Sequence, residues 1–495
     1  MPGLARRPLP IAALLVAAAT GCARLRPDTT PVLRVGTSGD YAPFSVERDG
    51  SLDGFDVEVA RRFARDAGFR LELVRFRWSE LGRDLAAGRF DVAMGGVTIR
   101  PERAIDATFT RPVVEAGAVV LARTGVARDV RELDRPAIRL GVNAGGHLER
   151  VARRLFPRAT VVPTADNRAL PGLLASAAVD AIVTDDVEAE RFAAELPPAD
   201  RFGPLTHDRK AYLGRDPALV ARLDAWLRAH EADGTLATLR AHWLGATRAG
   251  RRSAFESDVD ALLALVDLRL AFMPAVAAAK ARAHRPVLDA EQEARVLATV
   301  RERAMTRGLA PEPAVAFFQA QMDAARAVQE TFLAHPWDVE PLDLDREARP
   351  ALAGISELIL ARAADVTAEP AAIAALDPRA LAARLDPTLA DEARRSAIAN
   401  ALVQLRRAGA PSALHGAPER LVGVPARVPD PLGDVRRTRG SDTPALARDG
   451  GPRGGDREGA SGLGQESVRL RRAGTMRGAR HEATPAREAA ANAAR

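Results

Sequence analysis

Cysteine, tyrosine and lysine are nearly missing from this chain of 495 residues, which has one Cys and two Tyr. The single cysteine, Cys22, excludes an intramolecular disulfide. Lysine occurs twice, as Lys210 and Lys280, and subtracting these from 71 Lys+Arg leaves 69 arginines. Because the chain otherwise uses arginine for positive charge, we predict that both lysines occupy positions where arginine fails.

The chain also has no basic stripe interleaved with aromatic residues, and its aromatic content is 4%. The net charge is +6, but residues 411–495 hold 15 arginines against 10 acidic residues, which is +5 of that total. The rest of the chain is nearly neutral, so we expect no nucleic-acid partner.

The first residues have the pattern of an export signal. Two arginines precede the apolar segment Leu9–Gly21, whose roughly 13 residues are too few to cross a bilayer of ~30 Å. The segment ends in Ala-Thr-Gly-Cys, which resembles a bacterial lipobox and predicts acylation of Cys22. We therefore expect a signal peptide over 1–22 and an exported, periplasmic protein that meets the membrane only through a lipid anchor. The alternative is an ordinary cleaved signal with an incidental cysteine, and no later segment is expected to span a membrane.

Three regions with different residue patterns follow. The chain is too long to fold around a single hydrophobic core, so several domains are expected. Residues 32–248 alternate short β-type runs with helical stretches, which predicts an α/β fold with largely parallel sheets. Residues 253–410 repeat Ala, Leu, Arg and Glu at helical spacing, which predicts an all-helical domain with a long first helix over 256–283. Residues 411–495 are rich in Pro, Gly and Arg without periodicity, which predicts a disordered tail.

The α/β region resembles the family-3 periplasmic solute-binding proteins. The resemblance rests on four motifs in the expected order, namely Gly39–Ser45, Gly54–Val57, Gly96–Arg103 and Phe109–Pro112. It implies a two-lobed clamshell of the type II periplasmic-binding-protein class with the ligand in the cleft. It also implies that Arg103 holds a ligand carboxylate, to which a planar guanidinium is well matched.

Within that class, three features resemble the cyclohexadienyl dehydratases. The turn Asn143–Gly146 opens a helix after a strand and offers backbone amides to an anion. By the resemblance, Glu188 is the general acid and Lys210, on the return strand between the lobes, supports the site. The alternative is that Glu188 and Lys210 form an ion pair on the surface. His147 departs from the pattern, because relatives usually carry a hydroxyl residue there. The residues expected to bind substrate in this module are Tyr41, Trp78, Thr98, Arg103, Asn143, Gly145, Gly146, His147 and Asp185.

Two cations in the helical region lie on one helix face, because Arg269 and Lys280 are 11 residues apart, which is about three turns. The region resembles the AroQ-class chorismate mutases of the exported gamma subclass, most specifically at Pro286–Asp289. The resemblance implies that Arg269 grips a carboxylate, and that Lys280 and Gln329 donate to the ether oxygen of chorismate.

The same resemblance assigns Glu293 to the ring hydroxyl and places Asp289 and Gln292 among the substrate-binding residues. Gln292 is a departure, because the family usually has arginine there. Arg295, almost one turn later, is the candidate replacement.

Together the two resemblances predict a bifunctional exported enzyme of phenylalanine biosynthesis. It would convert chorismate to prephenate, and then prephenate to phenylpyruvate, L-arogenate to phenylalanine, or both, without a cofactor or metal. Two other classes stay open. One is a transporter lipoprotein that binds an amino acid or another small carboxylate, fused to a mutase. The other is a signalling or adaptor protein with both sites inactive. The sequence does not decide the preferred substrate or the oligomeric state.

Overall fold

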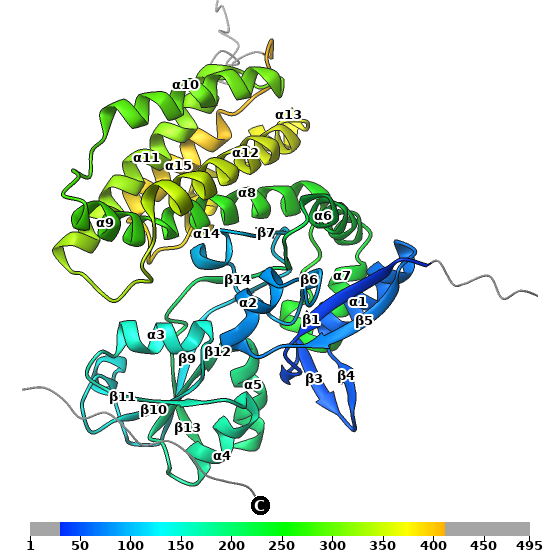
Figure 1. Cartoon of the computed structure of the whole chain (residues 1–495), viewed down its shortest axis with the longest axis vertical. Helices are drawn as coiled ribbons and strands as arrows, with labels where there is room; N and C mark the ends of the chain where they lie inside the picture. Colours follow the sequence, from blue (N-terminus) through cyan, green and yellow to red (C-terminus); the bar gives the residue numbers. More distant parts are fainter. Residues whose placement is uncertain (1–29, 411–495) are drawn as a thin grey trace, which may run out of the picture. The chain divides into compact units, whose positions relative to one another are not determined.

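The first lobe is built on a five-stranded sheet in the order β5-β1-β6-β15-β7 (Figure 1). β1 pairs in parallel with β5 and β6, whereas β15 joins antiparallel. The strands are β1 (Val32–Thr37), β5 (Arg70–Arg75), β6 (Val92–Ala93), β7 (Thr108–Phe109) and β15 (Leu213–Gly214). The helices are α1 (Phe55–Asp66), α2 (Leu81–Ala86), α6 (Pro217–Ala232) and α7 (Thr235–Leu244). A small separate sheet holds β2 (Asp40–Tyr41), β3 (Ser45–Arg48) and β4 (Ser51–Asp53).

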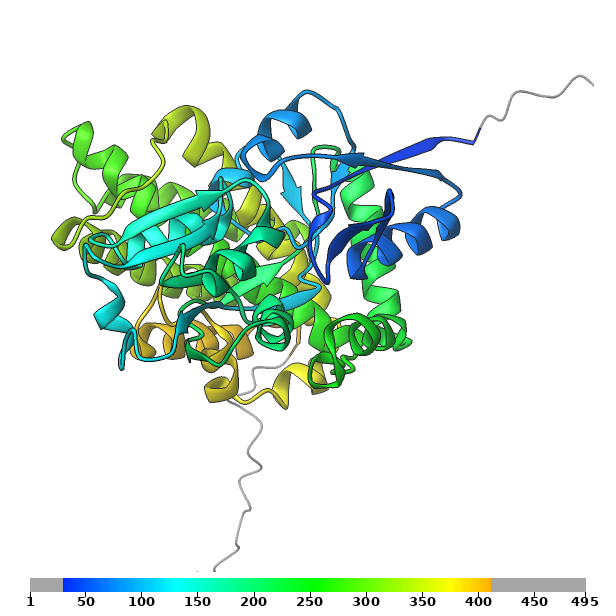
Figure 2. The same ribbon diagram turned by 90° about the horizontal axis from the view of Figure 1, so that it is seen from below.

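The second lobe repeats the plan with a sheet in the order β11-β10-β12-β9-β13. Its strands are β9 (Ala118–Arg123), β10 (Arg139–Asn143), β11 (Thr160–Thr164), β12 (Ala181–Asp185) and β13 (Ala199–Phe202). Its helices are α3 (His147–Leu155), α4 (Leu170–Ala175) and α5 (Asp186–Glu195). The strands of the first lobe, blue in Figure 2, and those of the second, cyan to green, belong to separate sheets. The expected α/β clamshell is therefore confirmed, but its sheets are mixed rather than largely parallel, because two of the four strand pairings in each sheet are antiparallel.

Two antiparallel strands connect the lobes. β8 (Val114–Ala116) carries the chain into the second lobe, and β14 (Asp208–Lys210) brings it back. Lys210 is therefore on the return strand, as expected.

The structure is a computed structural model that describes residues 30–410, so the expected signal peptide, lipid anchor at Cys22 and disordered tail lie outside the described residues. After the lobes, residues 254–403 are helical, which confirms the all-helical module (Figure 1). Its helices are α8 (Ala254–Ala271), α9 (Met273–Arg282), α10 (Ala290–Thr306), α11 (Pro311–Ala334), α12 (Arg349–Val366), α13 (Pro370–Ala374), α14 (Pro378–Arg384) and α15 (Glu392–Val403), with a short π-helix over Leu344–Ala348.

The long first helix expected over 256–283 is interrupted at Phe272, so it forms α8 and α9. Pro274 explains the break, because proline has no N–H to donate and its ring crowds the preceding turn. The stretch Ala254–Arg282 also corrects the expectation that no later segment could cross a membrane. Its mean hydropathy reaches 1.8, yet 78% of that window is buried inside the fold. Val259, Leu262 and Val266 are fully buried in a shared core, so this stretch serves as the central helix of the module.

Helix α8 also packs on the first lobe through buried charges. The Arg111 guanidinium lies 2.8 Å from an Asp224 carboxylate oxygen and 3.1 Å from one of Asp258, which is on α8. Arg209, the neighbour of Lys210 on β14, pairs with Asp267 of the same helix. The helical module is therefore fixed to the strand that joins the two lobes.

Candidate functional site

The second lobe presents two carboxylates where β12 ends and α5 begins. Asp185 is the N-cap of α5, and its Oδ1 accepts hydrogen bonds from the amides of Val187 (3.1 Å) and Glu188 (2.9 Å). This capping satisfies amides that the helix cannot pair itself and fixes Glu188 in the first turn. Both side chains are buried.

The Glu188 carboxyl group is held between two donors and shielded from water. Oε1 accepts from Asn167 Nδ2 at 2.5 Å, and Oε2 accepts from Thr184 Oγ1 at 2.6 Å. Burial raises the pKa of Glu188 to about 8, and the nearby Asp185 charge adds to that rise, although the two hydrogen bonds oppose it. The carboxyl group therefore carries a proton at neutral pH and can donate it.

Lys210 does not pair with Glu188, so the alternative of a surface ion pair between them is wrong. Its Nζ donates to Tyr41 Oη at 2.9 Å and Thr98 Oγ1 at 3.0 Å, and it lies 3.2 Å from Asp185 Oδ2. Tyr41 Oη in turn donates to Asp185. Burial keeps the pKa of Tyr41 well above its usual value, so the phenol stays a donor.

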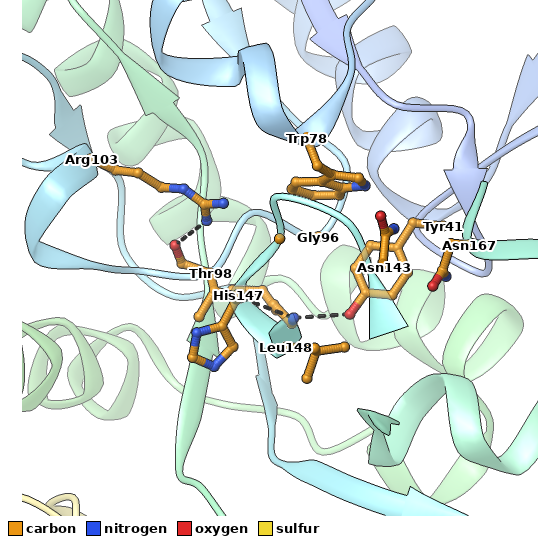
Figure 3. Close-up of a pocket in the computed structure, with 11 residues that line it drawn as sticks. Tyr41, Trp78, Gly96, Thr98, Arg103, Asn143, His147, Leu148 and Asn167 are labelled. Atoms are coloured by element: carbon orange, nitrogen blue, oxygen red, sulfur yellow. Dashed lines mark hydrogen bonds between the residues drawn. The ribbon is translucent and has the colours of Figure 1, made fainter. Parts of the chain in front are cut away.

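Arg103 faces the same space from the first lobe (Figure 3). Its Nη1 donates to the Thr98 carbonyl at 2.8 Å, and its guanidinium carbon lies 5.8 Å from the centre of the Trp78 ring. Burial lowers the pKa of Arg103 to about 9, and repulsion from Arg100 adds to this. Among residues 30–410, no carboxylate lies within ion-pair distance of it, so the cation is available to an anionic ligand.

These side chains surround a cavity of about 30 Å³. The volume is on the scale of one water molecule, so a six-membered-ring substrate can enter only if the lobes separate. Glu188 and Asp185 are not among the residues that line the cavity, but each contacts residues that do. Glu188 is hydrogen-bonded to Asn167, and Asp185 contacts Tyr41 and Lys210. The residues lining the cavity are Tyr41, Trp78, Gly96, Thr98, Arg103, Asn143, Gly146, His147, Leu148, Asn167 and Lys210 (Figure 3).

The glycine turn before α3 offers fewer free amides than the sequence suggests. Ala144 N donates to the Thr164 carbonyl at 2.8 Å, and Gly145 N donates to Glu149 Oε2 at 2.7 Å. Gly145 lines a neighbouring cavity of about 240 Å³ rather than the smaller one. An anion at this turn therefore depends on amides from Gly146 onward. His147, the first residue of α3, has its Nε2 2.9 Å from Asp208 Oδ1, and burial lowers its pKa.

The helical module brings its expected residues together from four helices. Arg269 is buried on α8, and burial lowers its pKa to about 10 against the opposing charge of Glu293. Lys280 on α9 donates to the Val287 carbonyl at 2.6 Å, and burial lowers its pKa while the charges of Asp289 and Glu293 oppose that effect. Gln329 on α11 donates to the Ala325 carbonyl at 3.2 Å.

At the start of α10, Asp289 is the N-cap and accepts from the Gln292 amide at 3.0 Å. The Gln292 side chain accepts from Arg295 at 3.0 Å, and Arg295 is exposed and paired with Glu291. Arg295 is thus directed to solvent-exposed partners, and the structure does not support it as the replacement cation. Arg326 on α11 instead lies 3.0 Å from Glu293 Oε2.

Asn167 and Arg326 contact expected site residues but are not predicted from the sequence. Asn167 lies 21 positions before Glu188, at the start of a short 3-10 helix over Asn167–Ala169, and no motif marks it. Arg326 is three residues before Gln329, and that spacing on a helix places both on one face, so this signal was available.

A clamshell with an open cation in its cleft, followed by a separate helical module with its own inward cations, defines a two-lobed ligand-binding protein with an appended domain. Residues 33–246 match the bacterial extracellular solute-binding proteins, family 3, and residues 258–330 match chorismate mutase type II. The chain belongs to the first of these families and carries a type II chorismate mutase domain behind that part.

Among curated relatives, a cyclohexadienyl dehydratase from Pseudomonas aeruginosa is 35% identical over 221 residues, which are 43% of this chain and 82% of that protein. A probable amino-acid ABC transporter-binding protein from Haemophilus influenzae is 28% identical over 228 residues, which are 44% of this chain and 87% of that protein. Among solved structures, an ancestral amino acid-binding protein described as a precursor of cyclohexadienyl dehydratase is 30% identical with a TM-score of 0.41, covering 43% of this chain and 95% of that one.

Proposed function

We propose that the protein is a bifunctional enzyme that rearranges chorismate to prephenate in the helical module and converts prephenate to phenylpyruvate in the cleft. The observation that carries the second activity is Glu188, a buried carboxyl group with a pKa of about 8 next to the cleft. A protein that only binds a ligand has no need of a proton donor there. The 35% identity with a cyclohexadienyl dehydratase supports this assignment.

The cleft reaction needs an acid because hydroxide is a poor leaving group. In the proposed step, Glu188 gives its proton to the ring hydroxyl of prephenate. The carbon–oxygen bond then breaks, and its electron pair leaves with the oxygen as water. The bond between the ring and its carboxylate breaks, and carbon dioxide departs. The electron pair of that bond stays in the ring and completes the aromatic system. A carboxylic acid can supply the proton near neutral pH because burial has raised its pKa.

The cations of the cleft would hold the two carboxylates of the substrate. Arg103 has no carboxylate partner of its own within residues 30–410 and offers a planar pair of donors. Amides from Gly146 onward, at the start of α3, offer a second anion site. The ring hydroxyl then comes within reach of the Glu188 carboxyl group when the lobes close on substrate.

The helical module needs no acid, base or nucleophile for its proposed reaction. Chorismate rearranges through a pericyclic transition state in which negative charge grows on the ether oxygen. Lys280 supplies a donor aimed at that charge, Gln329 can turn its amide toward it, and Arg269 holds a carboxylate so that the compact conformer is favoured.

The rival function, an amino-acid receptor, is favoured by the similarity to amino-acid-binding proteins but not by the state of Asp185. A ligand ammonium group needs a free carboxylate oxygen. Asp185 already accepts from two amides of α5, from Tyr41 and from Lys210. This arrangement supports an oxo acid such as prephenate, and a parallel assay with L-arogenate tests whether the amino analogue is excluded as well.

The test is to incubate the purified full chain with chorismate at neutral pH and to follow chorismate, prephenate and phenylpyruvate. We expect prephenate to appear first and phenylpyruvate to follow. If chorismate is consumed but added prephenate persists as it does without protein, the cleft is a receptor and the dehydratase assignment is wrong. If neither substrate changes, both activities are rejected.

The family to which residues 33–246 belong is extracellular. We further propose that acylation of Cys22 anchors the protein to a membrane, which mass spectrometry of the mature N-terminus tests.

A further inference from the structure

Arg326 points into the helical module from α11, on the same helix face as Gln329. Its guanidinium lies 3.0 Å from Glu293 Oε2 on α10. Its side chain is 32% exposed, in contrast to 55% for Arg295, the exposed cation on α10. Arg326 therefore reaches across two helices rather than into solvent.

Glu293 connects Arg326 to the rest of this site. Its charge raises the pKa of Arg269 and of Lys280 against the effect of burial, so Glu293 lies within electrostatic range of both cations. Arg326 pairs with the same carboxylate, so it belongs to the same cluster. Arg295 cannot serve in its place, because it binds Glu291 and the Gln292 side chain at the exposed start of α10.

Several polar atoms of this cluster are buried without a hydrogen-bond partner within residues 30–410. They are Nε of Arg326, Nε and Nη1 of Arg269, and Oε1 of Gln329. Buried donors are rarely left unpaired in native proteins. Unpaired donors on a guanidinium group of α8 and on one of α11, both of which Glu293 influences, are groups that a ligand with anionic oxygens would satisfy.

The charges of the groups around Glu293 also favour an anionic ligand. Arg269 and Lys280 against Glu293 leave one net positive charge, and Asp289 has its own counter-ion in Arg349 at 3.8 Å. Arg326 adds a further cation, and its second carboxylate neighbour, Asp323 at 3.7 Å, is 54% exposed to solvent, so the inward-facing groups keep a surplus of positive charge that suits an anionic ligand.

We propose that Arg326 binds one carboxylate of the chorismate dianion while Arg269 binds the other, with Glu293 holding the Arg326 guanidinium in position. This inference rests on the proposed mutase function and adds to it a binding residue on α11. It also explains how a site with the uncharged Gln292 can hold a doubly charged substrate.

The experiment measures chorismate consumption by the full chain and by Arg326→Met, which removes the charge but keeps an unbranched stem of similar length. We expect KM for chorismate to rise about tenfold or more while kcat stays within about threefold, because an interaction made equally in ground and transition states changes KM alone. Arg303→Met makes the same charge change at an exposed position of α10 that the proposed site does not use, and it should leave both constants near wild type.

The outcomes separate the two ideas. A wild-type chain that leaves chorismate untouched rejects the mutase function and this inference together. An active wild type whose KM is unaffected by Arg326→Met overturns the inference alone. A variant whose kcat and melting temperature fall while KM is unchanged also overturns it, because that pattern assigns Arg326 a structural role through Glu293.

Discussion

The side-chain amide of Asn167 donates a 2.5 Å hydrogen bond to Oε1 of Glu188, and its own carbonyl oxygen is buried without a partner in the described part of the chain. Asn167 lines the cavity, whereas Glu188 lies directly behind it. Asn167 thus connects the acid to the space where substrate would bind, and both residues can be tested separately.

Glu188→Gln should abolish phenylpyruvate formation while chorismate consumption continues, so that prephenate accumulates. An amide has nearly the size of the carboxyl group but cannot give a proton to the departing hydroxyl. The assay follows both products at neutral pH, because prephenate dehydrates spontaneously in acid. Glu190→Gln, at an exposed position of the same helix, is the matched control. Phenylpyruvate formation within threefold of wild type in Glu188→Gln would reject the assignment.

Asn167→Ala should shift the pH dependence of the dehydration. The Asn167 amide stabilises the ionised form of Glu188, so its removal raises the pKa of that carboxyl group further above 8. We expect the alkaline limb of kcat/KM for prephenate, which reports the free enzyme, to move to higher pH. The rate at pH 7 should fall roughly fivefold, as for the loss of one hydrogen bond of about 1 kcal/mol. A purely structural role for Asn167 would lower the rate without moving the limb.

Glu188 should also make folding stability depend on pH. Its pKa is about 8 in the folded protein against an ordinary 4.5, so the folded state holds a proton that the unfolded chain releases between these values. The stability linked to this proton is fully present below about pH 4.5 and is lost as the pH rises through 8. Relative to wild type, Glu188→Gln should therefore melt at progressively higher temperature as the pH is raised from 5 to 8. Parallel melting curves across that range would show that the carboxyl group is not protonated.

The backbone around Glu188 was predictable because its signals are local. The apolar run before Thr184 is typical of a strand, and an aspartate at the N-cap with a glutamate in the first turn is typical of a helix start, which is how β12 and α5 meet here. The Asn167 contact was not predictable, because it joins two segments that only the packing of the lobe brings together. The Gly145 amide was misjudged since its acceptor, Glu149, is a side chain one turn later that could equally have pointed to solvent.

The helical module shows the same division between local and tertiary information. The spacing of Arg269 and Lys280 predicts one face of one helix, but the break before Pro274 puts the two cations on separate helices, α8 and α9. The replacement cation could not be chosen by nearness in sequence. Arg295 is close to Gln292 along the chain, but Arg326 is the one that crossing helices bring to Glu293.

Asp258→Ala should destabilise the fold more than a typical substitution. The Asp258 side chain is 1% exposed and pairs with the buried Arg111 at 3.1 Å and with Arg228 at 2.8 Å. The substitution leaves the buried Arg111 guanidinium with Asp224 as its remaining carboxylate partner, so we expect a loss of roughly 2 kcal/mol, less than for a buried charge left fully unpaired. Denaturant unfolding measures this loss. Asp53→Ala, which breaks a half-exposed pair with Arg61, should cost no more than about 1 kcal/mol. Equal effects of the two substitutions would contradict a supporting role for the buried pair.

The two lysines give the most specific prediction, because the chain uses arginine elsewhere. Lys210 Nζ is buried among Tyr41, Thr98 and Asp185, and a wide planar guanidinium cannot occupy that space without displacing one of them. Lys210→Arg should therefore impair the dehydratase and leave the mutase intact. Lys280 Nζ lies 2.6 Å from the Val287 carbonyl, and in the proposed mutase reaction the same ammonium must reach one ether oxygen. A misplacement of about 1 Å can cost on the order of 100-fold in rate, so Lys280→Arg should remove mutase activity alone.

Each lysine variant serves as the control for the other, since both keep the charge and differ only in the module that they alter. Assays of both variants on chorismate and on prephenate give four rates to compare with wild type. Selective loss in each module supports the two sites independently, because a general folding defect would lower all four rates together. If both variants keep both activities near wild type, the rarity of lysine has no functional meaning here. The assignments of Lys210 and Lys280 would then be wrong, whatever the fate of Glu188.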